Sequence, residues 1–187
     1  MTITAYENLV STGERRAMIN NEKNTTSRVS DVFGTVPSIT GKVELVYEGE
    51  QEGAEEVAHH LIGKAIRKMF PTYFPDPELA RKRKKEEESD PYQKVLDWFN
   101  SNEIELPHEA SEKEHREKLE QIDGLKELVE KYHPRASEEE KTLLMEFILH
   151  GLSEYSMISR DQMETGLSFK DILSSVFSDT DLDDEDH

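Results

Sequence analysis

Ser137-Glu-Glu-Glu-Lys-Thr-Leu-Leu-Met-Glu-Phe-Ile-Leu-His-Gly-Leu-Ser-Glu-Tyr155 is the stretch that decides the fold of this chain. Ser137 and Glu140 have the spacing of a capping box, in which each side chain satisfies the free backbone N–H of the other residue. We therefore expect a long, well-capped helix that organises the second half of the chain. Its apolar residues recur every three or four positions, as on one face of an α-helix: Leu143, Leu144, Phe147, Ile148, Gly151, Leu152 and Tyr155.

The same apolar period predicts further helices on both sides of this one. On the N-terminal side, the pattern predicts helices over residues 3–20, 29–36 and 52–70, the second ending before Pro37 and the third stopping at Pro71. On the C-terminal side, helices are expected after Asp90-Pro91, after a second capping box at Ser111 and Glu114, and over residues 125–132 and 168–177.

One segment alternates in the way that a half-buried strand does. In Gly41-Lys-Val-Glu-Leu-Val-Tyr-Glu-Gly49, apolar and charged side chains take turns. A lone strand needs a partner, so this segment pairs with chain outside this sequence, forms a small ribbon or is a loop. Together the patterns predict a mainly α fold, an irregular helical bundle of about seven helices with at most one short strand or hairpin.

Charge and proline divide the chain into segments. The basic run Arg81–Lys85, followed by Glu86–Glu88, contains no apolar side chain, and we interpret it as a solvated linker rather than a nuclear signal or a nucleic-acid patch. The aromatic residues Trp98 and Phe99 fit core packing better than a partner interface. We expect five parts: a first helical part (1–38), a strand-like segment with a core helix and connector (39–78), a charged linker (79–90), a C-terminal helical region (91–178) and a disordered acidic tail (179–187).

The composition argues against several classes of function. Asp and Glu outnumber Lys and Arg by 41 to 23, and the net charge of -18 repels nucleic-acid phosphates and anionic membranes. There is no cysteine, so disulfides and thiolate metal sites are excluded. No stretch approaches the roughly 20 apolar residues of a membrane span, and no signal-peptide pattern is present. We expect a cytoplasmic protein that binds neither nucleic acid nor membrane.

No residue pattern supplies a complete catalytic site. Gly41-Lys42 is followed by Val43 and lacks the earlier glycine of a phosphate-binding loop. His59 and His60 are adjacent on a helix, point about 100° apart and cannot converge on one metal. Glu112 and His115, at i and i+3, form half of a carboxylate–histidine metal motif, which we interpret as a solvated pair. We therefore expect no catalytic, cofactor-binding or metal-binding residue and no cofactor in this chain.

Three blocks in the first third of the chain carry a family likeness: Ile3-Thr-Ala-Tyr-Glu-Asn-Leu-Val-Ser-Thr-Gly-Glu-Arg-Arg16, Arg28-Val-Ser-Asp-Val-Phe33 and Ile39-Thr-Gly-Lys-Val-Glu-Leu-Val-Tyr-Glu-Gly-Glu-Gln-Glu-Gly53. They resemble the C-terminal end of magnesium chelatase subunit I-like AAA+ ATPases, of the MoxR/chelatase type. The likeness continues through residues 65–70, Phe74-Pro-Asp-Pro77, Leu144-Met-Glu-Phe147 and His150-Gly151. It therefore extends over most of the chain and keeps its order.

This resemblance implies that residues 1–38 are the end of the AAA+ helical lid and the remainder a family-specific extension. The family's Walker A and B motifs, sensor residues and arginine finger have no counterpart in this sequence, and Arg15 and Arg16 do not match the sensor arginine. ATP and magnesium would then be bound by the parent ATPase, in a ring that is commonly six-membered. The implied partner is the rest of that ring or its client, with von Willebrand factor A domain proteins among the candidates.

Two functional hypotheses remain open. In the first, the chain is the C-terminal lid and regulatory or interaction region of such an ATPase, with no catalytic site of its own. In the second, it is a stand-alone helical protein-interaction adaptor without ATPase activity.

Overall fold

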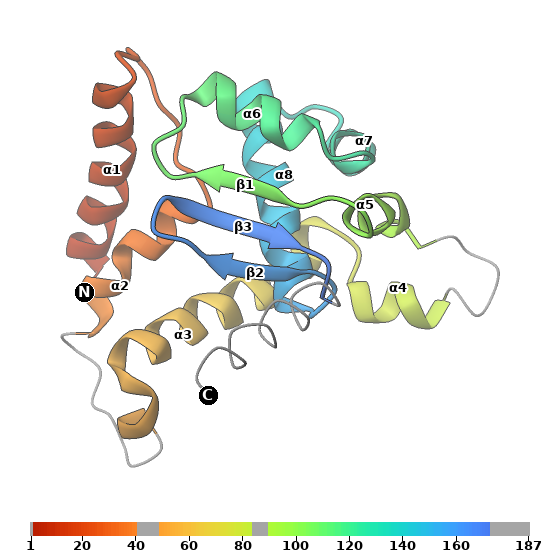
Figure 1. Ribbon diagram of the computed structural model, residues 1–187, viewed down its shortest axis with the longest axis horizontal. Coiled ribbons are helices and arrows are strands. Elements are labelled where there is room, and N and C mark those ends of the chain that lie inside the picture. Colours follow the sequence, from red (N-terminus) through yellow and green to blue (C-terminus); the bar gives the residue numbers. More distant parts are fainter. Residues whose placement is uncertain (1, 41–48, 84–89, 173–187) are drawn as a thin grey trace, which may run out of the picture.

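Helices pack with a small antiparallel sheet in the computed structural model, which describes residues 2–40, 49–83 and 90–172 (Figure 1). The first half consists of α1 (Thr2–Ile19), the 3₁₀ helix η1 (Ser30–Thr35), α2 (Val36–Thr40), α3 (Gly49–Tyr73) and α4 (Pro77–Arg83). The second half consists of α5 (Gln93–Phe99), β1 (Ile104–Pro107), α6 (Glu112–Glu120), α7 (Leu125–Tyr132), α8 (Glu138–Glu154), β2 (Ser159–Gln162) and β3 (Gly166–Lys170).

Helix α8 is the central element, as its sequence predicts. The Ser137 hydroxyl accepts the Glu140 N–H at 3.2 Å, and the Glu140 carboxylate accepts the Ser137 N–H at 2.7 Å, so the predicted capping box is present. The Ser111 hydroxyl likewise accepts the Glu114 N–H and caps α6. Residues on almost every side of α8 are buried, because it lies between α3, α6, α7 and the sheet.

Helix α3 packs against α8 and does not stop at Pro71. Proline has no N–H to donate to the carbonyl of Arg67, four residues earlier. The Tyr155 hydroxyl, at the end of α8, donates to that carbonyl at 3.4 Å, and α3 continues to Tyr73. The expected end at Pro71 is therefore wrong, because a side chain from the neighbouring helix replaces the missing donor.

The second predicted helix is also longer than expected. It comprises η1 followed by α2, and α2 begins at Val36 and contains Pro37. Proline is tolerated in the first turn of a helix, where its missing N–H has no intrahelical acceptor. The expected end before Pro37 is therefore wrong.

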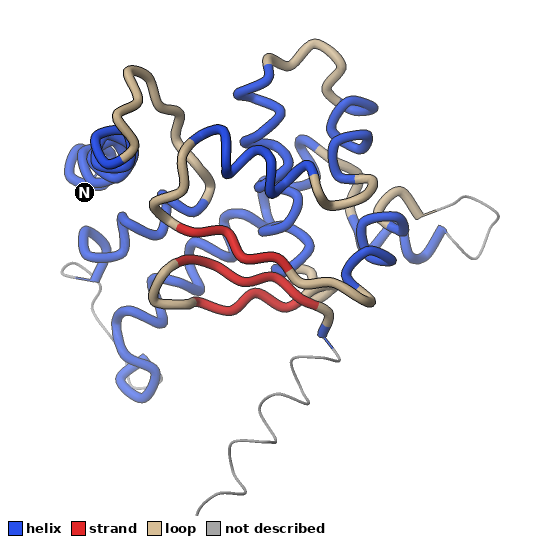
Figure 2. The backbone as a smooth tube through the Cα atoms, turned by 45° about the horizontal axis from the view of Figure 1, so that its top comes forward, coloured by secondary structure: helices blue, strands red, loops and turns tan. Residues whose placement is uncertain are grey.

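The sheet has the order β1-β3-β2, with both pairs antiparallel, and lies on one side of the helices (Figure 2). Phe169 in β3 is opposite Ile104 on one side and Arg160 on the other. The predicted helix over 168–177 is wrong at its start, because residues 168–170 belong to this central strand; residues 173–177 lie outside the described chain. The mainly α fold is confirmed, and the three strands exceed the single strand or hairpin that was expected.

The predicted strand at 41–49 cannot be compared, since residues 41–48 lie outside the described chain, as does the acidic tail 179–187. The division of the chain at 79–90 stays a prediction. Phe70 and Phe74 share one buried cluster with Tyr92, beyond that segment. Phe99 belongs to the same cluster and Trp98 packs against it, so the core interpretation of this pair is confirmed.

A second, smaller cluster joins the first half of the chain to α8. It contains Ala58, Ile62 and Ile66 of α3 together with Val29 and Val36. Phe147 of α8 packs against both clusters and connects them.

Candidate functional site

A network of buried charged side chains connects α1 to the rest of the chain. Its first member is Arg16, which is only 2% exposed. Its guanidinium forms a two-pronged ion pair with Asp31, with Nη1 2.6 Å from Oδ1 and Nη2 3.1 Å from Oδ2. Arg16 also donates to the backbone carbonyl of Thr26 at 2.7 Å.

Asp31 connects Arg16 to η1. It lies in the first turn of η1, and its Oδ2 accepts the backbone N–H of Arg28 at 2.8 Å. A carboxylate at this point satisfies a backbone donor that the short helix leaves free. The position of α1 is therefore fixed relative to the start of η1.

Glu112 extends the network to α6. Its carboxylate accepts the hydroxyls of Thr25 and Thr26, each at 3.1 Å, and lies 3.6 Å from both Arg16 and Arg28. Arg28 in turn donates to the carbonyl of Ala110 at 2.7 Å, just before α6. Glu112 therefore faces the segment between α1 and η1, whereas His115 faces Glu146 of α8.

Glu146 extends the network to α8. It is fully buried, and its two oxygens accept the backbone N–H groups of Val29 and Ser30 at 2.8 and 2.9 Å. The His115 Nε2 lies 3.6 Å from one oxygen and the His150 Nε2 lies 3.7 Å from the other. The expectation that His115 is solvated is thus wrong, because it faces a buried carboxylate on the neighbouring helix.

The surroundings of Glu146 and His150 determine their protonation states. Burial acts to raise the pKa of the Glu146 carboxyl, but the neighbouring His115 and His150 hold it well below its usual value. Burial, together with the positive charge of Arg160, lowers the pKa of His150. Arg160 donates to Nδ1 of His150 at 3.0 Å, so the imidazole is neutral and carries its proton on Nε2, toward Glu146.

We refer to Arg16, Arg28, Asp31, Glu112 and Glu146, with His115 and His150, as the polar clamp. It holds the segment between α1 and η1 against α6 and α8. Its carboxylates bind backbone N–H groups, hydroxyls and guanidinium groups of the same chain, which suits a positioning role, whereas both ring nitrogens of His115 are buried without a hydrogen bond. Among the described residues, no group of three His, Cys, Asp or Glu side chains is arranged to hold a metal ion.

The other predicted positions are not members of the polar clamp, although Arg15 and His59 line the same groove as Arg16 and Asp31. His59 and His60 are partly exposed on α3, and each pairs with a glutamate one turn earlier. Arg15 points outward to Glu109. A groove of about 1140 Å³ runs between α1, η1 and the β2–β3 turn, and its wall contains acidic and basic side chains together, so it favours no single class of ligand.

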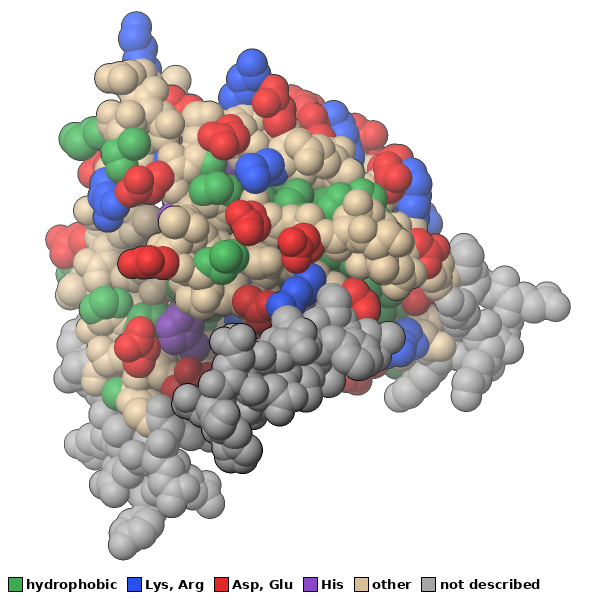
Figure 3. All heavy atoms as spheres, in the orientation of Figure 1, with side chains coloured by type: hydrophobic (Ala, Val, Ile, Leu, Met, Phe, Trp, Pro, Cys, Tyr) green, Lys and Arg blue, Asp and Glu red, His purple; other side chains and the backbone are tan. Residues whose placement is uncertain are grey.

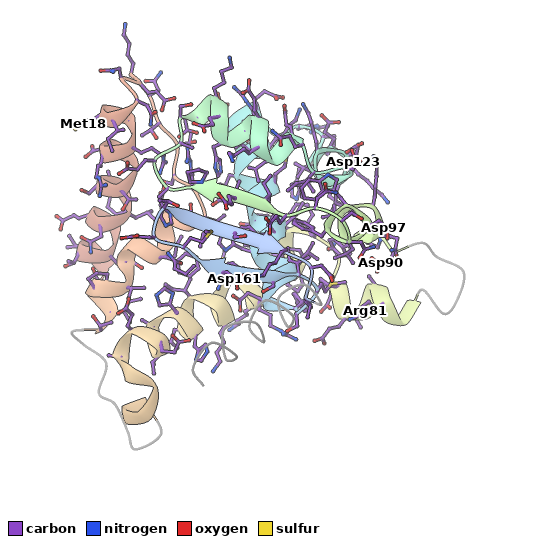
Figure 4. The ribbon with its side chains drawn as sticks, viewed as in Figure 1. Met18, Arg81, Asp90, Asp97, Asp123 and Asp161 are labelled. Carbon is purple, nitrogen blue, oxygen red and sulfur yellow. The ribbon has the colours of Figure 1, made fainter. Side chains whose placement is uncertain are left out.

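Two apolar side chains near the start of α1 are exposed among polar ones. Ile3 and Tyr6 are 75% and 66% exposed, and Val10 continues the same side at helical spacing. Helix α1 stands at the edge of the molecule, with Met18 pointing away from the body (Figure 4). Elsewhere, acidic side chains are scattered over the visible face rather than gathered in one patch (Figure 3).

Comparisons with known proteins identify no relative: no protein-family profile, curated protein or solved structure matches the chain. A scan of the described helices finds none that combines the length and apolar character of a membrane span.

Sequence reasoning missed the polar clamp, although one signal was present. Glu146 and His150 are one turn apart inside the longest apolar stripe of the chain. Two polar residues on a core-facing side of a helix indicate a buried network that must find partners elsewhere.

Proposed function

We propose that this chain is the C-terminal lid and regulatory region of a magnesium chelatase-like AAA+ ATPase, and that α1 contacts the ATPase. The observation that supports this is a difference between the two ends of α1. Near its C-terminal end Arg16 holds the helix to this chain, while near its N-terminal end Ile3 and Tyr6 are exposed to solvent. Exposed apolar side chains in helical register are typical of a surface that a partner covers.

Through the polar clamp, contact between α1 and the ATPase would affect other elements of this chain. A buried, bidentate ion pair fixes the orientation of α1 relative to η1 more narrowly than apolar packing does, because its hydrogen bonds depend on direction. A change in the position of α1 would act through Asp31 and Glu112 on η1 and α6, and through Glu146 on α8. ATP and magnesium belong to the ATPase in this proposal, and this chain supplies no catalytic residue. The setting is cytoplasmic, with neither nucleic acid nor membrane as a partner.

The experiment measures binding of this chain to the ATPase module of a magnesium chelatase-like AAA+ protein that lacks its own C-terminal extension. Tyr6→Asp is expected to weaken binding at least about tenfold, because it places a charge in the centre of the apolar contact. Met18→Asp is the matched control, since Met18 is also exposed on α1 but lies about three turns from Tyr6, near the other end of the helix. Equal losses for the two variants, or no binding by the unaltered chain, would overturn the proposal.

A stand-alone helical adaptor is the second candidate. It is favoured by the buried cluster that joins α3 to α5, α7, α8 and the sheet, which is large enough to suggest that the chain folds without a partner. A folded, monomeric chain that fails to bind or alter the ATPase module would select this candidate.

A further inference from the structure

Helix α3 carries a line of exposed apolar side chains that the core does not use. Leu61, Ala65, Met69 and Tyr73 follow one another at intervals of four residues. Leu61, Met69 and Tyr73 are 48%, 51% and 40% exposed. The core side of the same helix is formed instead by Ile62, Ile66 and Phe70, which are buried. Helix α3 is therefore apolar over a wider arc than its buried side, formed by Ile62, Ile66 and Phe70, among the residues that the structure describes.

The line continues onto α8. The ring of Tyr73 lies 5.6 Å from that of Phe147, edge to face. Leu143 precedes Phe147 by one turn of α8 and is 39% exposed. The exposed residues of the two helices thus meet at the Tyr73–Phe147 contact. We call Leu61, Met69, Tyr73 and Leu143 the α3 face.

The stretch of α3 that carries Leu61, Met69 and Tyr73 is free of acidic side chains, unlike the chain as a whole. The net charge is -18, yet residues 57–75 contain no Asp or Glu. Lys64 and Lys68 lie beside the apolar line and are exposed. Within the described part of the chain, neither lysine forms an ion pair, whereas Arg67 between them is engaged by Glu78 and by the carbonyl of Glu154.

We propose that the α3 face binds an amphipathic helix of a partner protein, whose apolar side is flanked by Asp or Glu. A line with one residue per helical turn, about 18 Å long from Leu61 to Tyr73, matches the apolar side of a second helix. The free lysines select acidic flanks at short range. A second α3 would bring lysines against lysines, which disfavours a symmetric contact between copies. This inference concerns a different helix from α1 and does not rest on the proposed function.

The probe is a fluorescently labelled helical peptide of about five turns, with leucines at helical spacing and glutamates beside them. The whole chain is expected to bind it, and Met69→Asp is expected to weaken binding at least about tenfold. Lys64→Glu with Lys68→Glu is expected to weaken binding while leaving the melting temperature unchanged, because both side chains are exposed. A peptide with lysines in place of the glutamates is expected to bind at least about tenfold less tightly.

Leu79→Asp is the matched control, because Leu79 on α4 is as exposed as Met69 but lies off the α3 face. A loss of binding equal to that of Met69→Asp would overturn the proposal, as would equal binding of the two peptides. Sedimentation of the whole chain tests whether a second copy of this chain occupies the α3 face instead. A dimer of this chain that Met69→Asp dissociates would assign the α3 face to self-association and overturn the proposal as well.

Discussion

Arg16 and Asp31 form a buried, bidentate ion pair, with the shorter of the two bonds at 2.6 Å and both side chains almost without exposure. They belong to two different helical elements that are separated by an irregular segment. The ion pair therefore fixes the position of α1 relative to η1, as apolar packing does for other helices.

Arg16→Met is expected to lower the free energy of unfolding by about 3–5 kcal/mol, because Asp31 is left as an uncompensated buried charge. Arg15→Met, at the neighbouring position, removes only an exposed pair with Glu109 and is expected to cost less than about 1 kcal/mol. Urea unfolding of the two variants measures the difference. Similar losses for both would mean that Asp31 is rehydrated at little cost.

Glu146→Gln is expected to loosen the segment that starts η1. The amide offers one carbonyl oxygen to two backbone donors, Val29 and Ser30, so one N–H loses its partner at a cost of about 1–3 kcal/mol. Hydrogen exchange measures this locally. The amides of residues 29 and 30 should exchange faster, while those of α7 keep their protection relative to global unfolding. Uniform acceleration throughout the chain would indicate a general loss of stability instead.

His150→Gln is expected to change how stability depends on pH. The pKa of His150 is lowered in the folded state, so the unfolded chain takes up its proton first as the pH falls below the ordinary value of 6.5. Stability contributed by neutral His150 is therefore lost from pH 6.5 downward, toward the lowered pKa. The variant should show a flatter decline of unfolding free energy in that window. Parallel curves for variant and parent would contradict this.

A separate acid-sensitive step is expected from Glu146. Its pKa is held well below 4.5, so its contribution is complete above that value and is lost as the pH falls through the folded-state pKa. His150→Gln should leave much of this lower step in place, because His115 also faces the carboxylate. Thermal melts at closely spaced pH values separate the two steps. A single transition shared by both windows would show that the two groups titrate as one unit.

Gly151→Ala and Gly13→Ala form a matched pair of helix substitutions. A methyl group at Gly151 would overlap the ring of Phe70, so the α3–α8 contact must shift and stability should fall by about 1–3 kcal/mol. At Gly13 the methyl group meets Thr25 at an ordinary 3.6 Å, and the higher helix propensity of alanine should add up to about 1 kcal/mol. Melting temperatures that move in the same direction would contradict the packing that we describe.

Apolar periodicity predicts most of the helices because each helix turns one apolar side to the core, and that side repeats every three or four residues. Helix α8 and its cap follow from Ser137 and Glu140 alone. The end of α3 could not be predicted, because the hydroxyl that replaces the missing donor of Pro71 comes from Tyr155, far along the sequence. Strand β3 was missed for a related reason: as the central strand it is buried on both faces and lacks the alternation that identifies a half-buried strand.

The polar clamp was harder to predict than the fold. A charged residue on a helix is usually solvated, and Arg16 stands beside the exposed Arg15. Its burial depends on Asp31, and the burial of Glu146 depends on two backbone donors, which no side-chain pattern reveals. Glu146 and His150 within an apolar stripe were the usable signal. Their partners became visible only when the chain was folded.

The order of the strands affects the sequence of events during synthesis on the ribosome. The middle strand, β3, is the last of the three to be made, and both outer strands depend on it. Ile104 therefore cannot pair with Phe169 until α6, α7 and α8 have been translated. Such distant pairing slows folding and leaves β1 without a neighbour for that interval. A nascent chain halted before residue 166 should accordingly hold its local helices but no sheet, and should be the form that chaperones and proteases recognise.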